Sequence, residues 1–586
     1  MLRDVSVEAS RIEKGACARE NPRSLRLGVS LATIIGTLRD SLARRAFRPT
    51  PVIIVAALVI STLPFLVAYW STPPGLRFSG FVLNAEDANS HLAKMMLGRR
   101  GEWLFYLNYS PEVSEGAFVN SLWNLLGWLA SVLGLQLVVM WHAARVVFGL
   151  VYLVAVAVTI NYFVGDQRQR TVALFLAVFG SGLGWVPLLF GQQFVVGERM
   201  IDFWLAEAYS VPVLVGYPHI LLAVAMLLLT FVLALKALET DRIVIGLASG
   251  FCALIYVLVH PFGIAVVDLP LAVYILVLAL LRLKGLVRSL PVLAPVFLLP
   301  LPVFAYDAAV FFTNDAFRAW SEQNLCLSPS PLLYVLGYGV MVPLALLGMA
   351  AVVKERAERR IFLIVLTTIV AFLLYLPFNS QRRFIEGLVV PLAILSAKGL
   401  AAYVWPRVGK EGSKILVRIA TPMILGLALP STLIFAAGLA YFSLSHPAQL
   451  YPDALAVEAI RWLGSSTRPD EVVLSSQRTG NLIPAIAGNT VVIGHWAETI
   501  GFEEKRRLVK AFFDERTTDD ERRAILERFR VSFVFYGPDE RLLGDYDVEE
   551  SPLLRRVYAN QRYEVFETVA ADEAPRVEET ISSRAN

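Results

Sequence analysis

Long apolar runs recur along most of this chain, and short polar segments separate them. A membrane-spanning helix needs about 20 apolar residues, because it rises 1.5 Å per residue across a hydrocarbon core of roughly 30 Å. Runs close to that length lie at 51–70, 139–164, 171–190, 218–238, 243–259, 264–281, 289–312, 331–353, 361–377, 387–404 and 415–443. The pattern predicts a polytopic α-helical membrane protein with about 11 spans, contained within residues 51–445.

The basic residues between the runs predict how the spans are oriented. Cytoplasmic loops of membrane proteins carry an excess of Lys and Arg, and residues 1–50 form an Arg-rich segment beside the first run. With that segment in the cytoplasm, alternation places five loops inside: Asp166–Arg170, Glu239–Arg242, Arg282–Arg288, Lys354–Arg360 and Pro406–Lys414. All but Glu239–Arg242 are basic, so the span count and the charges agree. An odd number of spans then leaves everything after residue 445 on the extracytoplasmic side of the cell membrane.

Residues 446–570 have a different pattern, in which amphipathic helices alternate with short apolar strands. This predicts a small extracytoplasmic α/β domain. Helices are expected from Asp453 to about Gly464, in FEEKRRLVKAFFDE and in TDDERRAILERF. Strands are expected in EVVLSS, TVVIGHW, VSFVFYG (Val531–Gly537) and YEVFETV (Tyr563–Val569). Residues 571–586 are predicted to be a disordered tail.

The first outer loop, residues 71–138, contains one more apolar stretch, Ala117–Leu135, which includes Trp123 and Trp128. A further span here would break the alternation of the basic loops, and Trp is favoured at membrane–water interfaces. We therefore expect a helix that lies in the outer interface of the membrane instead of crossing it.

The composition agrees with a membrane protein and argues against several other classes. Of 586 residues, 56% are hydrophobic and 17% are charged, with a mean hydropathy of +0.59. The net charge of +4 is too small to indicate a nucleic-acid partner. Cys17, Cys252 and Cys326 are far apart, which indicates neither a disulfide framework nor a zinc site.

The stretch NAEDANSHLAKM (Asn84–Met95) places charged groups directly after the first run, next to hydrocarbon, where charge is costly. Asp87, His91 and Lys94 are spaced i, i+4 and i+7, so a helix would carry them on one face. A helix N-cap is the ordinary structural explanation for Asp87. Because Glu86 stands beside it, the adjacent carboxylates favour a functional role, such as that of a general base.

Other polar residues fall at the outer ends of predicted spans: His219 in GYPH, His260 in HPFG, Asp307, and Arg382, Arg383 and Glu386 in the turn FNSQRRFIEG. An outer Arg pair runs against the usual placement of basic residues, and Arg presents a fork of donors that matches phosphate oxygens. The alternatives are pairing with Glu386 or with lipid headgroups for the arginines, helix-end capping for the histidines, and simple solvation for Asp307.

The acidic pair Glu86-Asp87, the apolar helix Ala117–Leu135 after it, the number of spans and the outward C-terminal domain together resemble the GT-C class of membrane glycosyltransferases. This class includes the protein mannosyltransferases and the lipid A aminoarabinose transferase. The resemblance implies an enzyme that transfers a sugar from a polyprenyl-phosphate-linked donor to a hydroxyl of a glycan, lipid or protein acceptor on the outer face of the membrane.

In such enzymes a first-loop carboxylate acts as the base, a role that the resemblance assigns here to Asp87 or Glu86. Basic residues of later outer loops hold the lipid phosphate, which points to Arg382 and Arg383, although these lie in a short QRRF turn in place of a long loop. The residues expected to line the site are His91, Lys94, His219, His260, Asp307 and Glu386. Some members also use a divalent cation, for which Asp87, His91 and His219 are candidate ligands.

Two other kinds of protein fit the pattern less well. A transporter or lipid flippase usually places ionisable groups or broken helices near the membrane midplane, whereas charges such as Arg145 and Asp268 lie toward the ends of their runs. A non-catalytic scaffold that displays the C-terminal domain would leave the acidic pair without an explanation.

Overall fold

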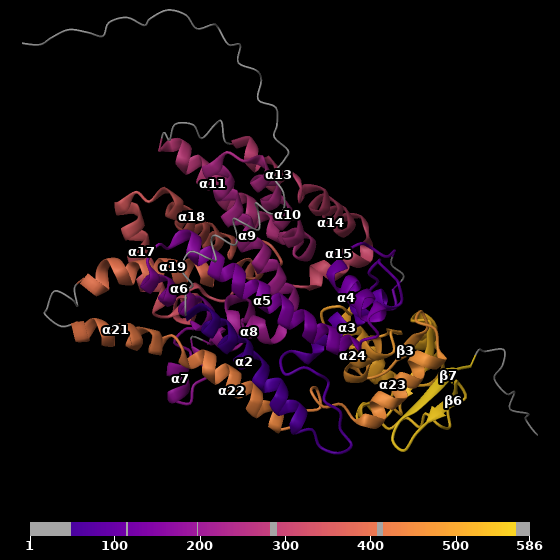
Figure 1. The fold of residues 1–586 in the computed structure, drawn as a ribbon. Coiled ribbons are helices and arrows are strands. Elements are labelled where there is room, and N and C mark those ends of the chain that lie inside the picture. The colour runs from indigo at the N-terminus through magenta and orange to yellow at the C-terminus, as the bar shows by residue number, and fades with distance from the viewer. Residues whose placement is uncertain (1–48, 113–114, 196, 282–289, 407–413, 570–586) are drawn as a thin grey trace, which may run out of the picture.

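The computed structural model describes residues 49–112, 115–195, 197–281, 290–406 and 414–569. Within these ranges the chain forms a large helical part that continues at one end into an α/β domain (Figure 1). The predicted N-terminal segment lies outside the described residues except for residues 49 and 50. The loop Arg282–Arg288, most of Pro406–Lys414 and the tail 571–586 also lie outside them.

Helices lie over the predicted spans, but eleven spans are not confirmed. Five helical runs in the described residues are long and apolar enough to cross a membrane: α2 (Pro49–Trp70), α5 (Leu137–Phe163), α9 (Pro218–Thr240), η3 with α11 (Pro261–Leu280), and η4 with α13 and α14 (Leu290–Thr313). The number rises to seven if each of two bent pairs is one span: α16 (Pro331–Tyr338) with α17 (Met341–Glu355), at 88°, and α21 (Lys414–Leu427) with α22 (Pro430–Leu444), at 43°.

The other predicted spans correspond to shorter helices: α6 (Gln167–Phe179), α10 (Ile243–Val259), α18 (Glu358–Leu373) and α19 (Val389–Gly399), which continues as a π-helix over Leu400–Val404. A 17-residue helix such as α10 rises about 26 Å, less than the hydrocarbon core of roughly 30 Å. The apolar run at 171–190 is interrupted at Gly180, where ψ of 131° takes the backbone out of the helix. In this run the apolar stretch is therefore longer than the helix in it.

The first outer loop contains α3 (Ala85–Arg99) and α4 (Ser121–Val132), which pack against each other. With 12 residues, α4 rises about 18 Å and is too short to cross the hydrocarbon core. Its place in the membrane interface stays a prediction. The two backbones cross closely, because a Cβ on Gly127 would overlap the carbonyl oxygen of Met95.

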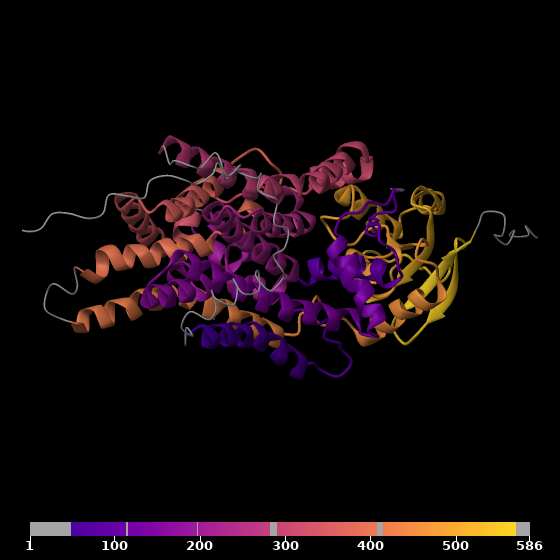
Figure 2. The ribbon, with the colours of Figure 1, turned by 45° about the horizontal axis from the view of Figure 1, so that its top comes forward.

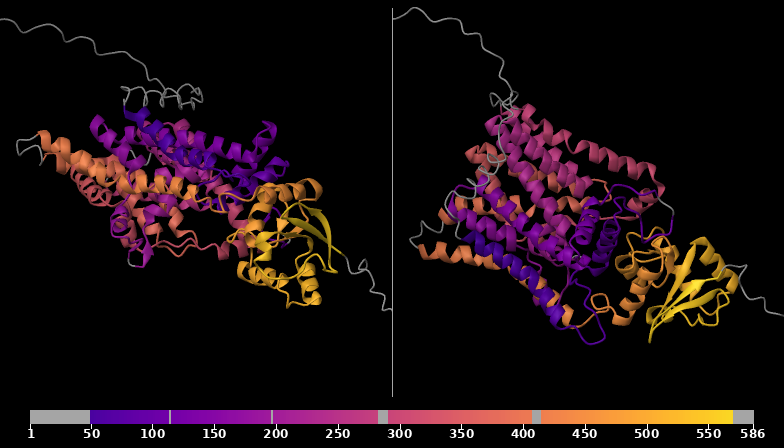
Figure 3. Two further views of the ribbon diagram at one scale, coloured as in Figure 1. Left: turned by 90° about the horizontal axis from the view of Figure 1, so that it is seen from below. Right: turned by 45° about the vertical axis from the view of Figure 1, so that its right-hand side comes forward.

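The C-terminal domain has three layers, in which a five-stranded sheet lies between two layers of helices (Figure 3). The strand order is β4-β3-β5-β7-β6, with β4, β3 and β5 parallel and β7 antiparallel to both β5 and β6. The strands are β3 (Val472–Leu474), β4 (Thr490–Val491), β5 (Val531–Tyr536), β6 (Leu554–Ala559) and β7 (Glu564–Thr568). One face packs against α23 (Ala454–Ser466) and α24 (Gln477–Ile486), and the other against α25 (Phe502–Phe512) and α26 (Asp519–Arg528).

The helices and strands predicted for this domain are confirmed, with two corrections. TVVIGHW contributes only the two residues of β4 to the sheet, and the residues after it turn away. Strand β6 was not predicted, because it lies at the sheet edge and carries the exposed Arg555 and Arg556 in place of an apolar run. Charged residues are a common feature of edge strands, where they oppose pairing with other chains.

The first outer loop and the C-terminal domain share a hydrophobic core at the junction between the two parts of the molecule (Figure 2). Ala93 of α3 and Tyr109 pack in one cluster with Ile460 and Ile483 of the domain. The hydroxyl of the fully buried Tyr109 donates to the carbonyl oxygen of Asn481 at 3.0 Å. The helix that carries the acidic pair is therefore packed directly against the C-terminal domain.

We expect Gly127→Ala to destabilise the crossing of α3 and α4, because the added methyl group would overlap the Met95 carbonyl oxygen. Overpacking of this kind costs roughly 1–3 kcal/mol and should lower the thermal unfolding midpoint of the detergent-solubilised protein. The control is Gly438→Ala in α22, where a Cβ meets open space. Equal midpoints for the two variants would contradict the close crossing.

Candidate functional site

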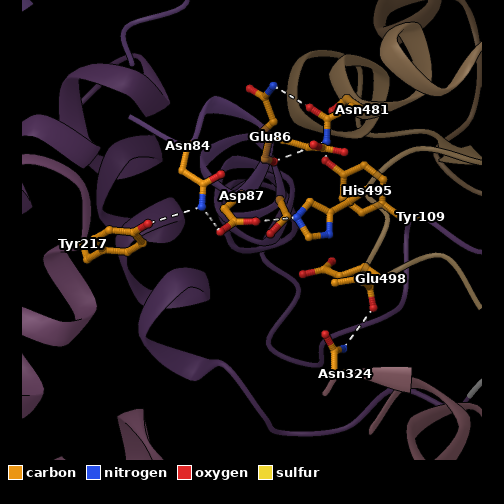
Figure 4. A network of polar contacts seen from close by, with 12 residues as sticks. Asn84, Glu86, Asp87, Tyr109, Tyr217, Asn324, Asn481, His495 and Glu498 are labelled. Carbon is orange, nitrogen blue, oxygen red and sulfur yellow. Dashed lines mark hydrogen bonds and ion pairs between the residues drawn. The ribbon is translucent and has the colours of Figure 1, made fainter. Parts of the chain in front are cut away.

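The acidic pair lies in the first turn of α3 (Figure 4). Asp87 does not cap the helix. The N-cap residue is Asn84, in the left-handed conformation with φ of 48°, and Asn84 Nδ2 donates to Asp87 Oδ2. The Asp87 side chain keeps 34% of its surface exposed. The carboxylate is therefore held by its neighbour and still accessible.

The C-terminal domain supplies the other partners of the pair. His495 Nε2 lies 2.7 Å from Asp87 Oδ1, although the two residues are 408 positions apart in the sequence. Gln477 Nε2 donates to Glu86 Oε1 at 3.3 Å, and Asn481 Nδ2 donates to the Glu86 carbonyl oxygen at 3.3 Å. Two distant segments of the chain thus form one polar site (Figure 4).

A buried ion pair anchors the segment that carries His495. Lys94 Nζ contacts Glu498 Oε1, and both residues are buried. Lys94 lies among the histidines of the site, since its charge acts on His91 and His495, but its side chain pairs with the C-terminal domain. A buried charge needs a partner, so Lys94 serves to hold the domain on α3.

The environment of His495 favours its protonated form. Burial opposes protonation, but the hydrogen bond with Asp87 and the charges of Glu498 and Asp87 outweigh it and raise the pKa of His495 above its usual value. By linkage, the stability that this contact contributes is fully present below the usual histidine pKa. It is lost as the pH rises through the raised pKa.

A row of rings runs from α3 toward the arginine-containing turn. His91 stacks on Trp123 with ring centroids 4.2 Å apart, and its ring lies 4.9 Å from that of His219. The rings of His219 and His260 are 5.5 Å apart, and His260 Nδ1 lies 2.7 Å from Glu386 Oε2. Burial and the neighbouring His219 lower the pKa of His91 well below its usual value, so this ring is neutral at neutral pH. The structure thus brings together four residues predicted from the sequence.

The arginine turn is the short helix η5 (Gln381–Ile385). Arg382 Nε lies 3.7 Å from Glu207 Oε1, and its guanidinium carbon lies 5.2 Å from the centre of the Trp204 ring. Glu207 comes from the short helix η2 (Ala206–Ala208), which precedes α8 (Ser210–Gly216), and the sequence analysis did not single it out. Arg382 is therefore already paired in part.

Part of the Arg383 side chain is exposed to solvent, and polar groups lie close to the rest of it. Burial opposes its charge, but its contact with Cys326 and the carboxylates of Glu207 and Glu386 outweigh this effect and raise the pKa of Arg383. The ion-pair partner of Glu386 is His260 and not an arginine. Arg383 therefore presents a permanent positive charge at the end of the histidine row.

Tyr217 lies between the acidic pair and the arginine turn. Asn84 Nδ2 donates to Tyr217 Oη at 3.3 Å. Burial raises the pKa of Tyr217 and the carboxylates of Asp87 and Glu207 raise it further, whereas the hydrogen bond with Asn84 and the charge of Arg382 oppose the rise. Asn84 thus donates to both Asp87 and Tyr217 and links the acidic pair to the residue that precedes α9.

Asp307 and the candidate metal ligands are not joined into one cluster. Asp307 is buried in α14, a helix that packs against η3, next to His260. Among the described residues, no hydrogen bond or ion pair links Asp307 to the histidine row, and its role in the site stays a prediction. Asp87, His91 and His219 do not form a metal site, because the described part of the chain holds no group of three or more His, Cys, Asp or Glu that could bind a metal ion. The divalent cation stays a prediction without an assigned site, and no step below depends on it.

Sequence reasoning missed the residues that the C-terminal domain contributes, which are Gln477, Asn481, His495 and Glu498. One signal was present. The His-Trp pair ends the predicted strand TVVIGHW, and α/β domains bind ligands at the carboxyl ends of their strands. Nothing in the sequence, however, indicates that this end faces the first outer loop.

The arrangement combines two chemical capacities. Asp87 offers an accessible carboxylate that can accept a proton. The arginine turn offers guanidinium groups that can bind phosphate oxygens. A substrate with a phosphate and a reacting group near it would match both.

Several solved structures have a similar fold. No model of a known protein family and no protein of curated function matches the sequence. The structure is similar to the oligosaccharyltransferase of Archaeoglobus fulgidus tethered to an acceptor peptide, with a TM-score of 0.52 and 13% identity, over 91% of this chain and 75% of that chain. It is also similar to ArnT of Cupriavidus metallidurans bound to undecaprenyl phosphate (0.44, 15%, 89% and 98%) and to the mycobacterial arabinofuranosyltransferase AftD (0.48, 14%, 88% and 40%).

The oligosaccharyltransferase is a GT-C glycosyltransferase, and its TM-score above 0.5 gives this chain a GT-C-like fold. At 13% identity, the likeness concerns the fold alone.

Proposed function

We propose that this chain transfers a sugar from a polyprenyl-phosphate-linked donor to an acceptor hydroxyl on the outer face of the cell membrane. The observation that carries the proposal is the row of rings that joins α3, the helix of Asp87, to the pair His260–Glu386 next to the arginine turn, in a protein with a GT-C-like fold. The oligosaccharyltransferase with a similar fold holds an acceptor peptide, which supports transfer to an acceptor. The acceptor here is a glycan, a lipid or a protein, and membrane lipid surrounds the helical part.

Asp87 is the proposed general base, and Glu86 is the second candidate. The acceptor oxygen forms a bond to the anomeric carbon of the sugar while the bond from that carbon to the phosphate oxygen breaks. Asp87 takes the hydroxyl proton, and the electron pair of the broken bond leaves with the polyprenyl phosphate. A carboxylate has about four acceptor positions, so the contacts with Asn84 and His495 leave room for the hydroxyl.

Arg383 and Arg382 are proposed to bind the donor phosphate. The phosphate gains negative charge as the sugar leaves, and guanidinium groups placed beside it stabilise that charge. Arg383 is the stronger candidate, because Arg382 already lies against Glu207. His260 and Glu386 lie beside Arg383 and would fix the walls of the phosphate site.

The acceptor is proposed to approach beside His495. A cavity of about 400 Å³ lies there, lined by Gln323, Trp496, Gly501, Phe502, Glu503 and Glu504. Half of the Trp496 surface is exposed, and this residue follows His495 directly. Trp496 therefore links the cavity to the segment that carries His495, and the acceptor is proposed to reach the base from this side.

We expect Asp87→Asn to lower sugar transfer roughly 10²–10⁴-fold, because a positioned base contributes about that much to the rate. The measurement is transfer in membranes supplied with a radiolabelled polyprenyl-phosphate sugar, at matched protein level. Asp520→Asn, at an exposed position of α26, is the control. Full activity of both Asp87→Asn and Glu86→Gln would rule out the proposed base.

We expect Arg383→Ala to raise the apparent KM for the lipid-linked donor by about 10–100-fold, since hydrogen bonds to charged groups contribute about 1.5–3 kcal/mol. Arg382→Ala should have a smaller effect, because its charge is partly paired with Glu207. The exposed Arg507→Ala serves as the control. Donor affinity that is unchanged in both Arg382→Ala and Arg383→Ala would dismiss the phosphate role.

The proposed topology places the N-terminus in the cytoplasm and the C-terminal domain outside. In a variant that lacks Cys17, Cys252 and Cys326, we expect a cysteine introduced by Ser466→Cys to react with a membrane-impermeant maleimide added to intact cells. A cysteine introduced by Thr240→Cys, in the predicted cytoplasmic loop, should react only after permeabilisation. Both positions are exposed in the structure, so the reverse labelling pattern would invert the orientation.

A further inference from the structure

The C-terminal domain contacts the proposed base through His495, a residue with no role in the reaction described above. We propose that His495 is a positioning residue, which holds the Asp87 carboxylate in the orientation that receives the acceptor proton. The catalytic site would then be complete only when the C-terminal domain is docked on α3. This inference rests on the proposed function of Asp87.

The Asp87 carboxylate is held through both of its oxygens. Asn84 Nδ2 donates to Oδ2, and His495 Nε2 lies 2.7 Å from Oδ1. Asn84 belongs to the same turn of α3, whereas His495 approaches from the C-terminal domain. Rotation of the carboxylate plane would break at least one of these contacts, so the two together define one orientation of a side chain that is otherwise free to turn.

His495 is itself held in place, as a positioning residue must be. Thr499 N donates to the His495 carbonyl oxygen at 2.9 Å, and Gln323 Nε2, from the end of α15 (Asp315–Gln323), donates to the Thr499 carbonyl oxygen at 2.9 Å. On the other side of the segment, Glu498 forms the buried ion pair with Lys94 of α3. The imidazole is therefore fixed relative to both α3 and the helical part.

The contacts of His495 indicate that it acts through Asp87 and not on a substrate. Its side chain is 5% exposed, so a bound donor or acceptor has little access to the ring. Within the described part of the chain, Nδ1 is buried and forms no hydrogen bond, and Nε2 faces Asp87. The polar contact of the His495 ring is therefore the one between Nε2 and Asp87, which is the contact that a positioning role requires.

The test compares three variants of the full-length protein in membranes supplied with the radiolabelled polyprenyl-phosphate sugar. His495→Ala removes the hydrogen-bond donor to Asp87. We expect kcat to fall about 100-fold, as for a catalytic group misplaced by about 1 Å. The KM for the lipid-linked sugar should be unchanged. His495→Gln keeps an N–H group at similar reach, and it should recover at least a tenth of the wild-type kcat. His446→Ala removes another contact between these regions, in which His446 Nε2 lies 2.6 Å from the Ser71 carbonyl oxygen, and it should stay within twofold of wild type.

A double variant separates positioning from general damage. If His495 acts through Asp87, then His495→Ala should cause no further loss in an Asp87→Asn background, because residues that act as a unit are not additive. Full activity of His495→Ala together with an inactive Asp87→Asn would overturn this inference and leave the proposed base intact. An active Asp87→Asn would instead remove the base itself. Equal loss of kcat in His495→Ala and His495→Gln would also overturn the inference, because the N–H group retained in His495→Gln would then not restore the orientation of the Asp87 carboxylate.

Discussion

The buried ion pair between Lys94 and Glu498 joins positions 404 residues apart, and the geometry of the site depends on it. Breaking a buried pair by removing one partner typically costs about 3–5 kcal/mol, because a charge is left without compensation. The pair therefore gives the C-terminal domain one docked position on α3. In that position His495 reaches Asp87, and Gln477 reaches Glu86. The chemistry of the acidic pair is thus set by an interface between two parts of the chain.

The helical part contributes the opposite end of the site. The first turn of α9 and the ends of α10 and α18 meet there, and they bring His219, His260 and the arginine turn together. Rings that are stacked or edge-to-face leave little freedom between these groups, and the neutral His91 does not compete with a guanidinium for an anion. A carboxylate at one end and fixed positive charge at the other give the site a polarity that suits a substrate with a phosphate and a reacting carbon beside it.

The sequence was sufficient for features that depend on local pattern. The apolar runs placed the helices, the alternation of residues 446–570 placed most of the C-terminal domain, and the polarity of the outer ends brought attention to Asp87, His219, His260 and Arg383. Features that depend on the tertiary structure could not be predicted from the sequence. The run at 171–190 does not reveal the break at Gly180, and the charge of Lys94 does not reveal that it is buried.

The separation of Asp87 from His495 by 408 positions also has a consequence for biogenesis. A chain leaves the ribosome from its N-terminus, and its domains fold in that order. Helix α3 is therefore made, and the membrane helices after it are inserted, long before the segment that meets it exists. An interrupted or truncated product would retain the acidic pair and the arginine turn but would have no imidazole against the carboxylate. Synthesis to the far end of the chain is therefore required before the contact between His495 and Asp87 can form.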